Sequence, residues 1–142
     1  MINDNCVIHE SVQIIEPVNL YGCDLKENVF VGPFVEIQTN VTIGKNSRIQ
    51  SHSFICSAVV IGEDCFIGHG TVFVNDKFSN NKVNYERDFE ETIINDNVII
   101  GSNATILPVE ICSGAIIGAG SVVTKNIDQP GKYAGNPAKL VN

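Results

Sequence analysis

The chain has 142 residues, of which 44% are apolar, and a formal net charge of −7 at pH 7. This length suits one domain, residues 1–142, and the negative charge excludes nucleic acid as a general partner because a phosphate backbone needs a basic surface. No apolar run reaches the roughly 18 residues of a membrane-spanning helix, and the N-terminus lacks a basic and apolar leader, so we expect a cytoplasmic protein without a membrane partner.

Apolar residues recur every six positions along most of the chain. They stand at Ile2, Ile8, Ile14, Leu20, Leu25, Val31, Ile37, Ile43, Ile49, Ile55, Ile61, Ile67, Phe73, Ile94, Ile100, Ile106, Ile111, Ile117 and Val123. A period of six fits neither an α-helix nor a long amphipathic strand. It predicts an all-β repeat protein in which three short strands and three corners close a triangular coil of about 18 residues. Stacked coils would pair as parallel strands about 4.8 Å apart.

Two five-residue steps interrupt this period, before Leu25 and before Ile111. At both steps the position expected to point inward holds an acidic residue, and the residue just before it is small and apolar. We therefore expect Cys23 and Val109 to point inward in place of Asp24 and Glu110. The five cysteines include no C-x-x-C pair and are expected to be reduced core or turn residues.

The period stops between Phe73 and Ile94, which predicts a long loop at about residues 74–93. The loop is polar but carries three aromatic and three basic residues: Phe78, Tyr85, Phe89, Lys77, Lys82 and Arg87. A long loop in a regular repeat is usually functional or disordered, and this composition favours an ordered loop that faces a ligand. After Ile127, glycine and proline residues predict a short C-terminal cap at 128–142, which would cover the last strand edge.

Three segments resemble the hexapeptide-repeat acyltransferases: IGSNATILP at 100–108, IGAGSVVTK at 117–125 and YAGNPAK at 133–139. The resemblance covers essentially the whole chain. It implies a left-handed parallel β-helix shaped as a triangular prism, a homotrimer with active sites at the subunit interfaces, and acetyl-coenzyme A as cosubstrate without a metal. The left hand comes from this resemblance alone, because crossover connections are usually right-handed.

Within that family, GHGTVFVND at 68–76 and FEET at 89–92 look like nucleotide-aminosugar N-acetyltransferases. Those enzymes acetylate a 3-amino or 4-amino group on a deoxysugar linked to dTDP or UDP, and some serve lipopolysaccharide or other surface-glycan synthesis. The related sugar O-acetyltransferases carry a catalytic histidine at the place that Phe78 holds here. A hydroxyl needs a base to become a nucleophile, whereas a neutral amine attacks a thioester directly, so this departure favours N-acetylation.

The resemblance implies three catalytic candidates. Asn75 would hydrogen-bond the sugar or its amine, and Asp76 would accept a proton, although the same pair also fits an Asx turn that opens the loop. His69 occupies a corner, where it is either catalytic or simply solvated. His52 lies at a corner one coil earlier and is a weaker candidate, and His9, near the terminal coil, is expected to have no role.

The resemblance also implies a set of cofactor-binding residues. The backbone amides of Ser102 and Ala119 would contact the pantetheine arm and the thioester, while Thr124, Lys125 and Lys139 would meet the outer part of coenzyme A and its phosphates. The segment 106–111 departs from the family by being one residue short, without a glycine after its proline, which would reshape the cofactor groove.

Three alternatives remain open from the sequence. The first is O-acetylation of a sugar or another small hydroxyl acceptor. The second is zinc catalysis as in the carbonic-anhydrase branch of this fold, which needs three histidines from neighbouring coils, whereas only His52 and His69 lie plausibly near each other. The third is a non-catalytic β-helix scaffold, which explains the period but not the loop or the three coenzyme-type segments.

Overall fold

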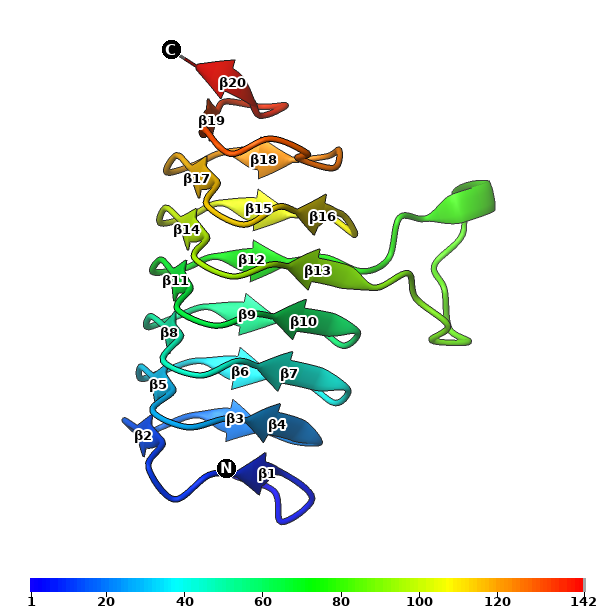
Figure 1. The fold of residues 1–142 in the computed structure, drawn as a ribbon. Coiled ribbons are helices and arrows are strands. Elements are labelled where there is room, and N and C mark those ends of the chain that lie inside the picture. The colour runs from blue at the N-terminus through cyan, green and yellow to red at the C-terminus, as the bar shows by residue number, and fades with distance from the viewer. Residues whose placement is uncertain (142) are drawn as a thin grey trace.

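The computed structural model describes residues 1–141, whose strands form three sheets around one axis (Figure 1). Sheet I contains β1 (Val7–Ile8), β4 (Cys23–Leu25), β7 (Val41–Ile43), β10 (Val59–Ile61), β13 (Thr92–Ile94) and β16 (Glu110–Ile111). Sheet II contains β2 (Gln13–Ile14), β5 (Phe30–Val31), β8 (Arg48–Ile49), β11 (Phe66–Ile67), β14 (Ile99–Ile100), β17 (Ile116–Ile117), β19 (Lys132–Ala134) and β20 (Lys139–Val141). Sheet III contains β3 (Asn19–Leu20), β6 (Glu36–Ile37), β9 (Phe54–Ile55), β12 (Val72–Phe73), β15 (Thr105–Ile106) and β18 (Val122–Val123).

The chain visits sheets I, II and III in turn, and each strand pairs in parallel with the equivalent strand of the next coil, from β1–β4 to β15–β18. In Figure 1 the strands of sheet I run right to left at the front, and those of sheet III run left to right behind them, while the chain rises from the N-terminus. This path is a left-handed parallel β-helix. The predicted fold class is therefore confirmed.

The six-residue positions form the core. From Leu20 to Val123 every one of them is buried. Burying each branched aliphatic side chain is worth about 1.5–3 kcal/mol, so the aligned rows supply most of the stabilisation. In the first coil of this sequence, Ile8 and Ile14 are half-buried and Ile2 is 39% exposed.

Both five-residue steps are accommodated as predicted. Cys23 and Val109 are buried, while Asp24 is half-buried and Glu110 is exposed. All five cysteines are free thiols. Burial raises the pKa of Cys56 from 9.0 to about 12, and burial together with the neighbouring Cys6 thiol raises that of Cys23 to about 12. These two thiols are therefore protonated and unreactive at neutral pH.

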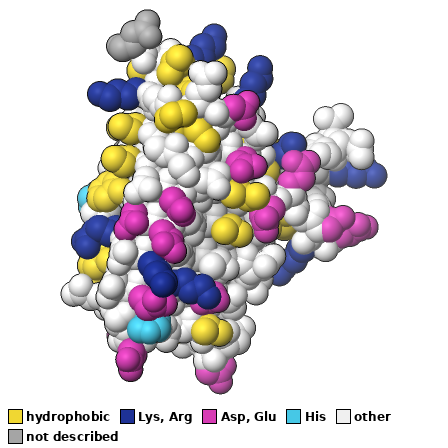
Figure 2. All heavy atoms as spheres, viewed as in Figure 1, with side chains coloured by type: hydrophobic (Ala, Val, Ile, Leu, Met, Phe, Trp, Pro, Cys, Tyr) yellow, Lys and Arg dark blue, Asp and Glu magenta, His cyan; other side chains and the backbone are white. Residues whose placement is uncertain are grey.

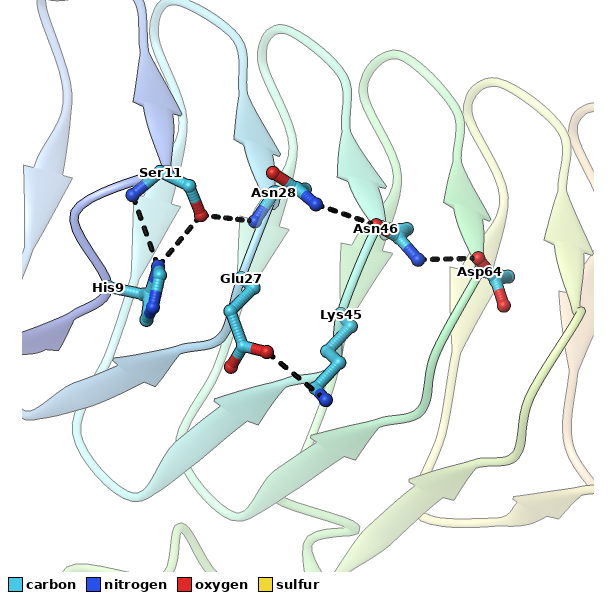
Figure 3. Close-up of polar contacts among 7 residues, drawn as sticks. All are labelled: His9, Ser11, Glu27, Asn28, Lys45, Asn46 and Asp64. Atoms are coloured by element: carbon cyan, nitrogen blue, oxygen red, sulfur yellow. Dashed lines mark hydrogen bonds and ion pairs between the residues drawn. The ribbon is translucent and has the colours of Figure 1, made fainter.

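Most corners contain a residue in the left-handed backbone region, and asparagine or aspartate usually fills this role at the corner between sheets I and II. Asn28, Asn46 and Asp64 have φ values of 59°, 65° and 56°. Their side chains form a ladder, with Asn28 Nδ2 donating to Asn46 Oδ1 at 3.3 Å and Asn46 Nδ2 donating to Asp64 Oδ1 at 3.1 Å (Figure 3). Short polar side chains tolerate this backbone and link successive coils.

The loop leaves the prism between β12 and β13, at the corner between sheets III and I (Figure 1). The coil resumes at Thr92, two residues earlier than the six-residue series indicates, because Thr92 is buried in register with Val59. The loop contains one 3₁₀ turn, Ser79–Asn81. At the other end, β19 extends sheet II and β20 pairs with it antiparallel, which caps the last coil.

The outer surface is mixed. Figure 2 shows basic and acidic side chains together on the extruded loop and hydrophobic side chains along the edge formed by sheet II. Phe66, Ile99 and Ile116 occupy outward positions of that sheet. Residues 1–141 contain no helix with the length and apolar character that crossing a bilayer requires.

Candidate active site

One column of backbone donors runs along the corner between sheets II and III. Ser51, His69, Ser102 and Ala119 occupy equivalent positions of this corner in successive coils, and backbone hydrogen bonds of 2.8–3.0 Å between neighbouring coils hold them in register. Within residues 1–141, the N–H groups of these four residues donate to no acceptor of the chain. Because a backbone N–H is a strong donor, the column offers hydrogen bonds to a ligand that lies along this edge.

Glycine allows the coils to approach closely beside this column. A Cβ added to Gly101 would lie 2.6 Å from Ala119 N, and one added to Gly68 would lie 2.7 Å from Ser102 N. Real Cβ atoms essentially never approach backbone atoms so closely. The glycines that precede the column therefore set the spacing of its amides.

The three histidines differ in their surroundings, although His52 and His69 lie at the same corner in neighbouring coils. The His69 side chain is exposed at the corner and makes no hydrogen bond with residues 1–141. His52 stacks on Phe34, with ring centroids 4.9 Å apart. His9 lies in the first coil, where its Nδ1 is 2.8 Å from Ser11 Oγ (Figure 3). Among the described residues, no group of three or more His, Cys, Asp or Glu side chains is placed to hold a metal ion.

Asn75 and Asp76 build the base of the loop. Asn75 Nδ2 donates to the carbonyl oxygen of Ser57 at 3.1 Å and to its Oγ at 2.9 Å, which leaves Asn75 Oδ1 as an available acceptor. Asp76 Oδ1 accepts from Phe78 N at 2.9 Å, and Oδ2 accepts from Asn84 N at 2.8 Å. Asp76 therefore forms the Asx turn that was one reading of the sequence, and it also ties together two distant points of the loop.

Two hollows adjoin the loop. One of about 450 Å³ lies within the loop itself. The other, of about 700 Å³, lies between the loop and the outer surface of sheet III, where Tyr21, Phe54, Val72, Arg87 and Phe89 contribute to its lining. We call this second hollow the sub-loop groove.

The predicted catalytic residues do not meet within one chain. His69 lies before β12, at the corner between sheets II and III, whereas Asn75 and Asp76 follow β12 at the corner between sheets III and I. The column of amides and the loop thus lie on opposite edges of sheet III. A reaction that needs both requires either two chains, one supplying the column and the other the loop, or a ligand that extends across the sheet.

The predicted cofactor-binding residues divide in the same way. Lys139 begins β20 and pairs with Ala134, whose Cβ faces Gly118 beside the column. Lys139 therefore lies at the end of sheet II, two strands beyond Gly118 and on the Ala119 side of the column. Thr124 and Lys125 are exposed and follow β18, at the same edge of sheet III as the loop.

Two features of the site were not predicted. The anchoring of Asn75 on Ser57 depends on stacking across 18 residues of sequence, and the sub-loop groove brings Tyr21 within reach of the loop although 66 residues separate it from Arg87. The loop composition indicated a ligand, but no local pattern distinguished Tyr21. The repeat period could have identified it, because Tyr21 directly follows an inward residue at the corner from which the loop later emerges.

Two family models match the repeats. The model described as bacterial transferase hexapeptide (six repeats) matches residues 22–57, and the one described as hexapeptide repeat of succinyl-transferase matches residues 58–74 and 91–125. The interruption between the last two segments coincides with the extruded loop. The models therefore match the coils and omit the segment that leaves them.

Known proteins with similar sequences or folds include acyl-transfer enzymes. The chain is 44% identical over 135 residues to the bifunctional protein GlmU of Wigglesworthia glossinidia brevipalpis, covering 93% of this chain and 27% of that protein. It spans 24–30% of the length of the curated relatives it matches.

Among solved structures, AntD, an N-acyltransferase from Bacillus cereus in complex with dTDP-4-amino-4,6-dideoxyglucose and coenzyme A, has a TM-score of 0.84 at 24% identity and 96% and 82% coverage of the two chains. Soybean serine acetyltransferase in complex with serine has a TM-score of 0.61 at 34% identity, with 75% and 42% coverage. The repeat matches, the left-handed coils and these similarities together show that the chain belongs to the hexapeptide-repeat acyltransferase family.

Proposed function

We propose that this protein is an acetyl-coenzyme A-dependent N-acetyltransferase that acts on the 3- or 4-amino group of a deoxysugar linked to dTDP or UDP. The observation that carries the proposal is a column of uncommitted backbone donors on one edge of sheet III, opposite a loop whose base presents Asn75. AntD, the similar structure, is an N-acyltransferase in complex with a dTDP-linked amino sugar and coenzyme A, which supports the same substrate class here.

The donors suit a thioester cosubstrate. Acetyl-coenzyme A would lie along the corner between sheets II and III, with its amide-rich pantetheine arm on the N–H groups of Ser102 and Ala119 and its phosphates near Lys139. A backbone donor at the thioester oxygen would also stabilise the negative charge that develops there during acyl transfer, an effect commonly worth about 3 kcal/mol.

The loop suits an amine nucleophile. Phe78 stands where the related O-acetyltransferases have a histidine, and both oxygens of Asp76 already accept backbone N–H groups. The substrate nitrogen would therefore attack the thioester carbon in its neutral form, oriented by Asn75 Oδ1. The C–S bond then breaks, coenzyme A leaves as the thiol, and the nitrogen loses its extra proton to give the amide.

The two edges of sheet III would be brought together by assembly as a homotrimer. If three chains surround an axis with sheet III turned inward, the amide column of one chain lies beside the loop of the next. Thr124 and Lys125 would then come from the same chain as the loop and meet the outer part of coenzyme A. The outward residues Phe54, Val72 and Val122 give this sheet an apolar surface that a neighbouring chain, or a ligand held between two chains, would cover.

Mixing two variants, each impaired in a different half of the site, tests whether the site is shared. We expect Asn75→Ala to disable the loop and Ala119→Pro to disable the amide column, each as a pure protein. In randomly mixed rings, one site in four would combine an intact column with an intact neighbouring loop, so about one quarter of wild-type activity should return on co-expression. Activity no higher than the average of the two variants would place the whole site within one chain and contradict this assembly.

A second candidate function is O-acetylation of a small hydroxyl acceptor. The similarity to soybean serine acetyltransferase supports it, because serine offers a hydroxyl group. His69 would then be the base, since its exposed side chain lies in the same column as Ser102 and Ala119.

A thiol-release assay with acetyl-coenzyme A separates these functions. The acceptors are dTDP- and UDP-linked 3-amino and 4-amino deoxysugars, the matching hydroxy sugars, free serine and maltose. Turnover confined to amines supports the proposal, and turnover of hydroxyl acceptors supports O-acetylation. If no acceptor is acetylated and acetyl-coenzyme A does not bind, the results instead support a non-catalytic β-helix scaffold.

The mechanism predicts unequal effects of two alanine substitutions. Asn75→Ala should slow turnover by about tenfold or more because it removes both the acceptor and the anchor on Ser57, whereas His69→Ala should cost less than the roughly 100-fold expected for a true base. Steady-state kinetics would measure both, with Ser57→Ala as a control that weakens the anchor but keeps Asn75 Oδ1. The rate should also rise with pH until the substrate amine is deprotonated. Loss of all turnover in His69→Ala, with unchanged substrate affinities, would identify His69 as the base.

A further inference from the structure

The sub-loop groove has the size and lining of a ligand site. Its volume of about 700 Å³ lies within the range of about 300–1,000 Å³ that small-molecule sites occupy. Phe54 and Val72 project outward from β9 and β12 and form its floor, while Tyr21 and Phe89 lie at its sides. Aromatic and aliphatic surface therefore faces a space that the chain itself does not fill.

Arg87 is the basic residue of this groove. It lies in the second half of the extruded loop, and its backbone has a left-handed φ of 64°. Burial raises the pKa of Tyr21, as does the charge of Glu36, and the positive charge of Arg87 opposes both. Arg87 thus lines the same groove as Tyr21, which follows β3, three strands below the origin of the loop in sheet III.

The guanidinium of Arg87 makes no ion pair or hydrogen bond with residues 1–141. The carboxylates near the groove are engaged otherwise: Asp76 accepts two backbone N–H groups, Glu36 accepts side-chain amides at 3.2 and 3.0 Å, and Asp88 accepts one at 3.1 Å. By contrast, Lys77 on the same loop is paired with Glu90 at 3.1 Å. Arg87 is therefore a cation available to a ligand at the edge of an aromatic groove.

We propose that the sub-loop groove binds the nucleoside diphosphate part of the acceptor, with the base against Phe54 and Phe89 and the diphosphate on Arg87. An aromatic floor stacks on a nucleobase, and the planar guanidinium matches phosphate oxygens in a bidentate manner. This inference rests on the proposed function and completes it, because Asn75 and Asp76 lie at the upper end of the groove, where the sugar would emerge.

Binding of nucleoside diphosphates alone tests this assignment. Calorimetry on the full chain would use dTDP, UDP and GDP as probes, with acetyl-coenzyme A as a separate ligand. We expect Arg87→Gln to weaken binding of the preferred diphosphate by about 10- to 100-fold, since hydrogen bonds to a charged group are lost, and Arg87→Lys to weaken it less. The matched control is Lys82→Gln, which removes the same charge from a loop residue lining the other hollow and should leave binding unchanged.

The outcomes separate this site from the proposed activity. Equal affinities in Arg87→Gln and Lys82→Gln, or no diphosphate binding at millimolar concentration, would overturn the assignment. If the wild type still acetylates an amine in that case, the N-acetyltransferase activity stands and only the groove is wrong. Diphosphate binding that depends on Arg87, without any thiol release from acetyl-coenzyme A, would support the groove as a nucleotide site and contradict the proposed acetyltransferase activity. Acetyl-coenzyme A affinity should not change in any of these variants.

Discussion

Replacing Ala119 by proline is expected to lower kcat/KM for acetyl-coenzyme A by about 100-fold, because the substitution removes a single backbone donor from the thioester region. Proline lacks the N–H group but fits this corner, as Pro33 occupies the same position of the corner between sheets II and III in an earlier coil. In both places the preceding residue is glycine. The change therefore removes one hydrogen bond without requiring a new backbone conformation.

Steady-state kinetics and direct binding of acetyl-coenzyme A would measure this effect, and thermal unfolding would verify that the fold is retained. Ser51→Pro is the matched control, since Ser51 belongs to the same column but lies three coils from Ala119. We expect its affinity for acetyl-coenzyme A to match that of the wild type. An Ala119→Pro protein that folds normally and retains wild-type kinetics would show that this amide does not contact the cosubstrate.

Replacing Gly101 by alanine is expected to destabilise the protein by about 3 kcal/mol, the upper part of the usual range for overpacking. The new Cβ would lie 2.6 Å from Ala119 N and 2.9 Å from Ala119 Cα, so two coils would have to move apart. Because these atoms belong to the backbone, no change of side-chain rotamer can relieve the contact. The separation would also displace the amides of the column and weaken acetyl-coenzyme A binding.

Urea unfolding would measure the loss, with Gly120→Ala as the matched control at the same corner. No atom lies within 4 Å of a Cβ added to Gly120, so only its φ of +69° opposes alanine. A left-handed backbone costs a non-glycine residue about 1–2 kcal/mol, and Ala58 already adopts one with φ of 66°. Equal destabilisation by the two substitutions would mean that conformation, rather than close packing of the coils, explains the glycines.

The homotrimer is the part of the proposal on which the position of the active site depends most. Sheet III separates the amide column from the loop, and no movement of the two-residue strand β12 can bring His69 and Asn75 together. Assembly through this sheet would place the amide column of one chain beside the loop of the next chain. Arg87 and the sub-loop groove would then lie at the same interface, so assembly and acceptor binding should be thermodynamically linked.

The six-residue spacing by itself determined the coil, because only short strands and corners place an apolar residue inward at that interval. It also determined where the loop leaves the prism and why Cys23 and Val109 replace Asp24 and Glu110 in the core. The spacing could not determine the hand of the coil, since either hand buries the same residues. That required the resemblance to known proteins, and the path of the chain then confirmed it.

Only the tertiary structure decided which residues stack on one another and which edge of the prism each occupies. Asn75 contacts Ser57, and Arg87 lines one groove with Tyr21, because coils of 17 or 18 residues place distant segments side by side. The polar loop sequence does not indicate which residues of other coils it will contact. The same stacking places Ser102 and Ala119 in one column with His69, yet puts Thr124 and Lys125 across sheet III. Local sequence patterns specify which side of a strand faces the core, whereas the partners of an outward residue depend on the height and corner at which the whole chain places it.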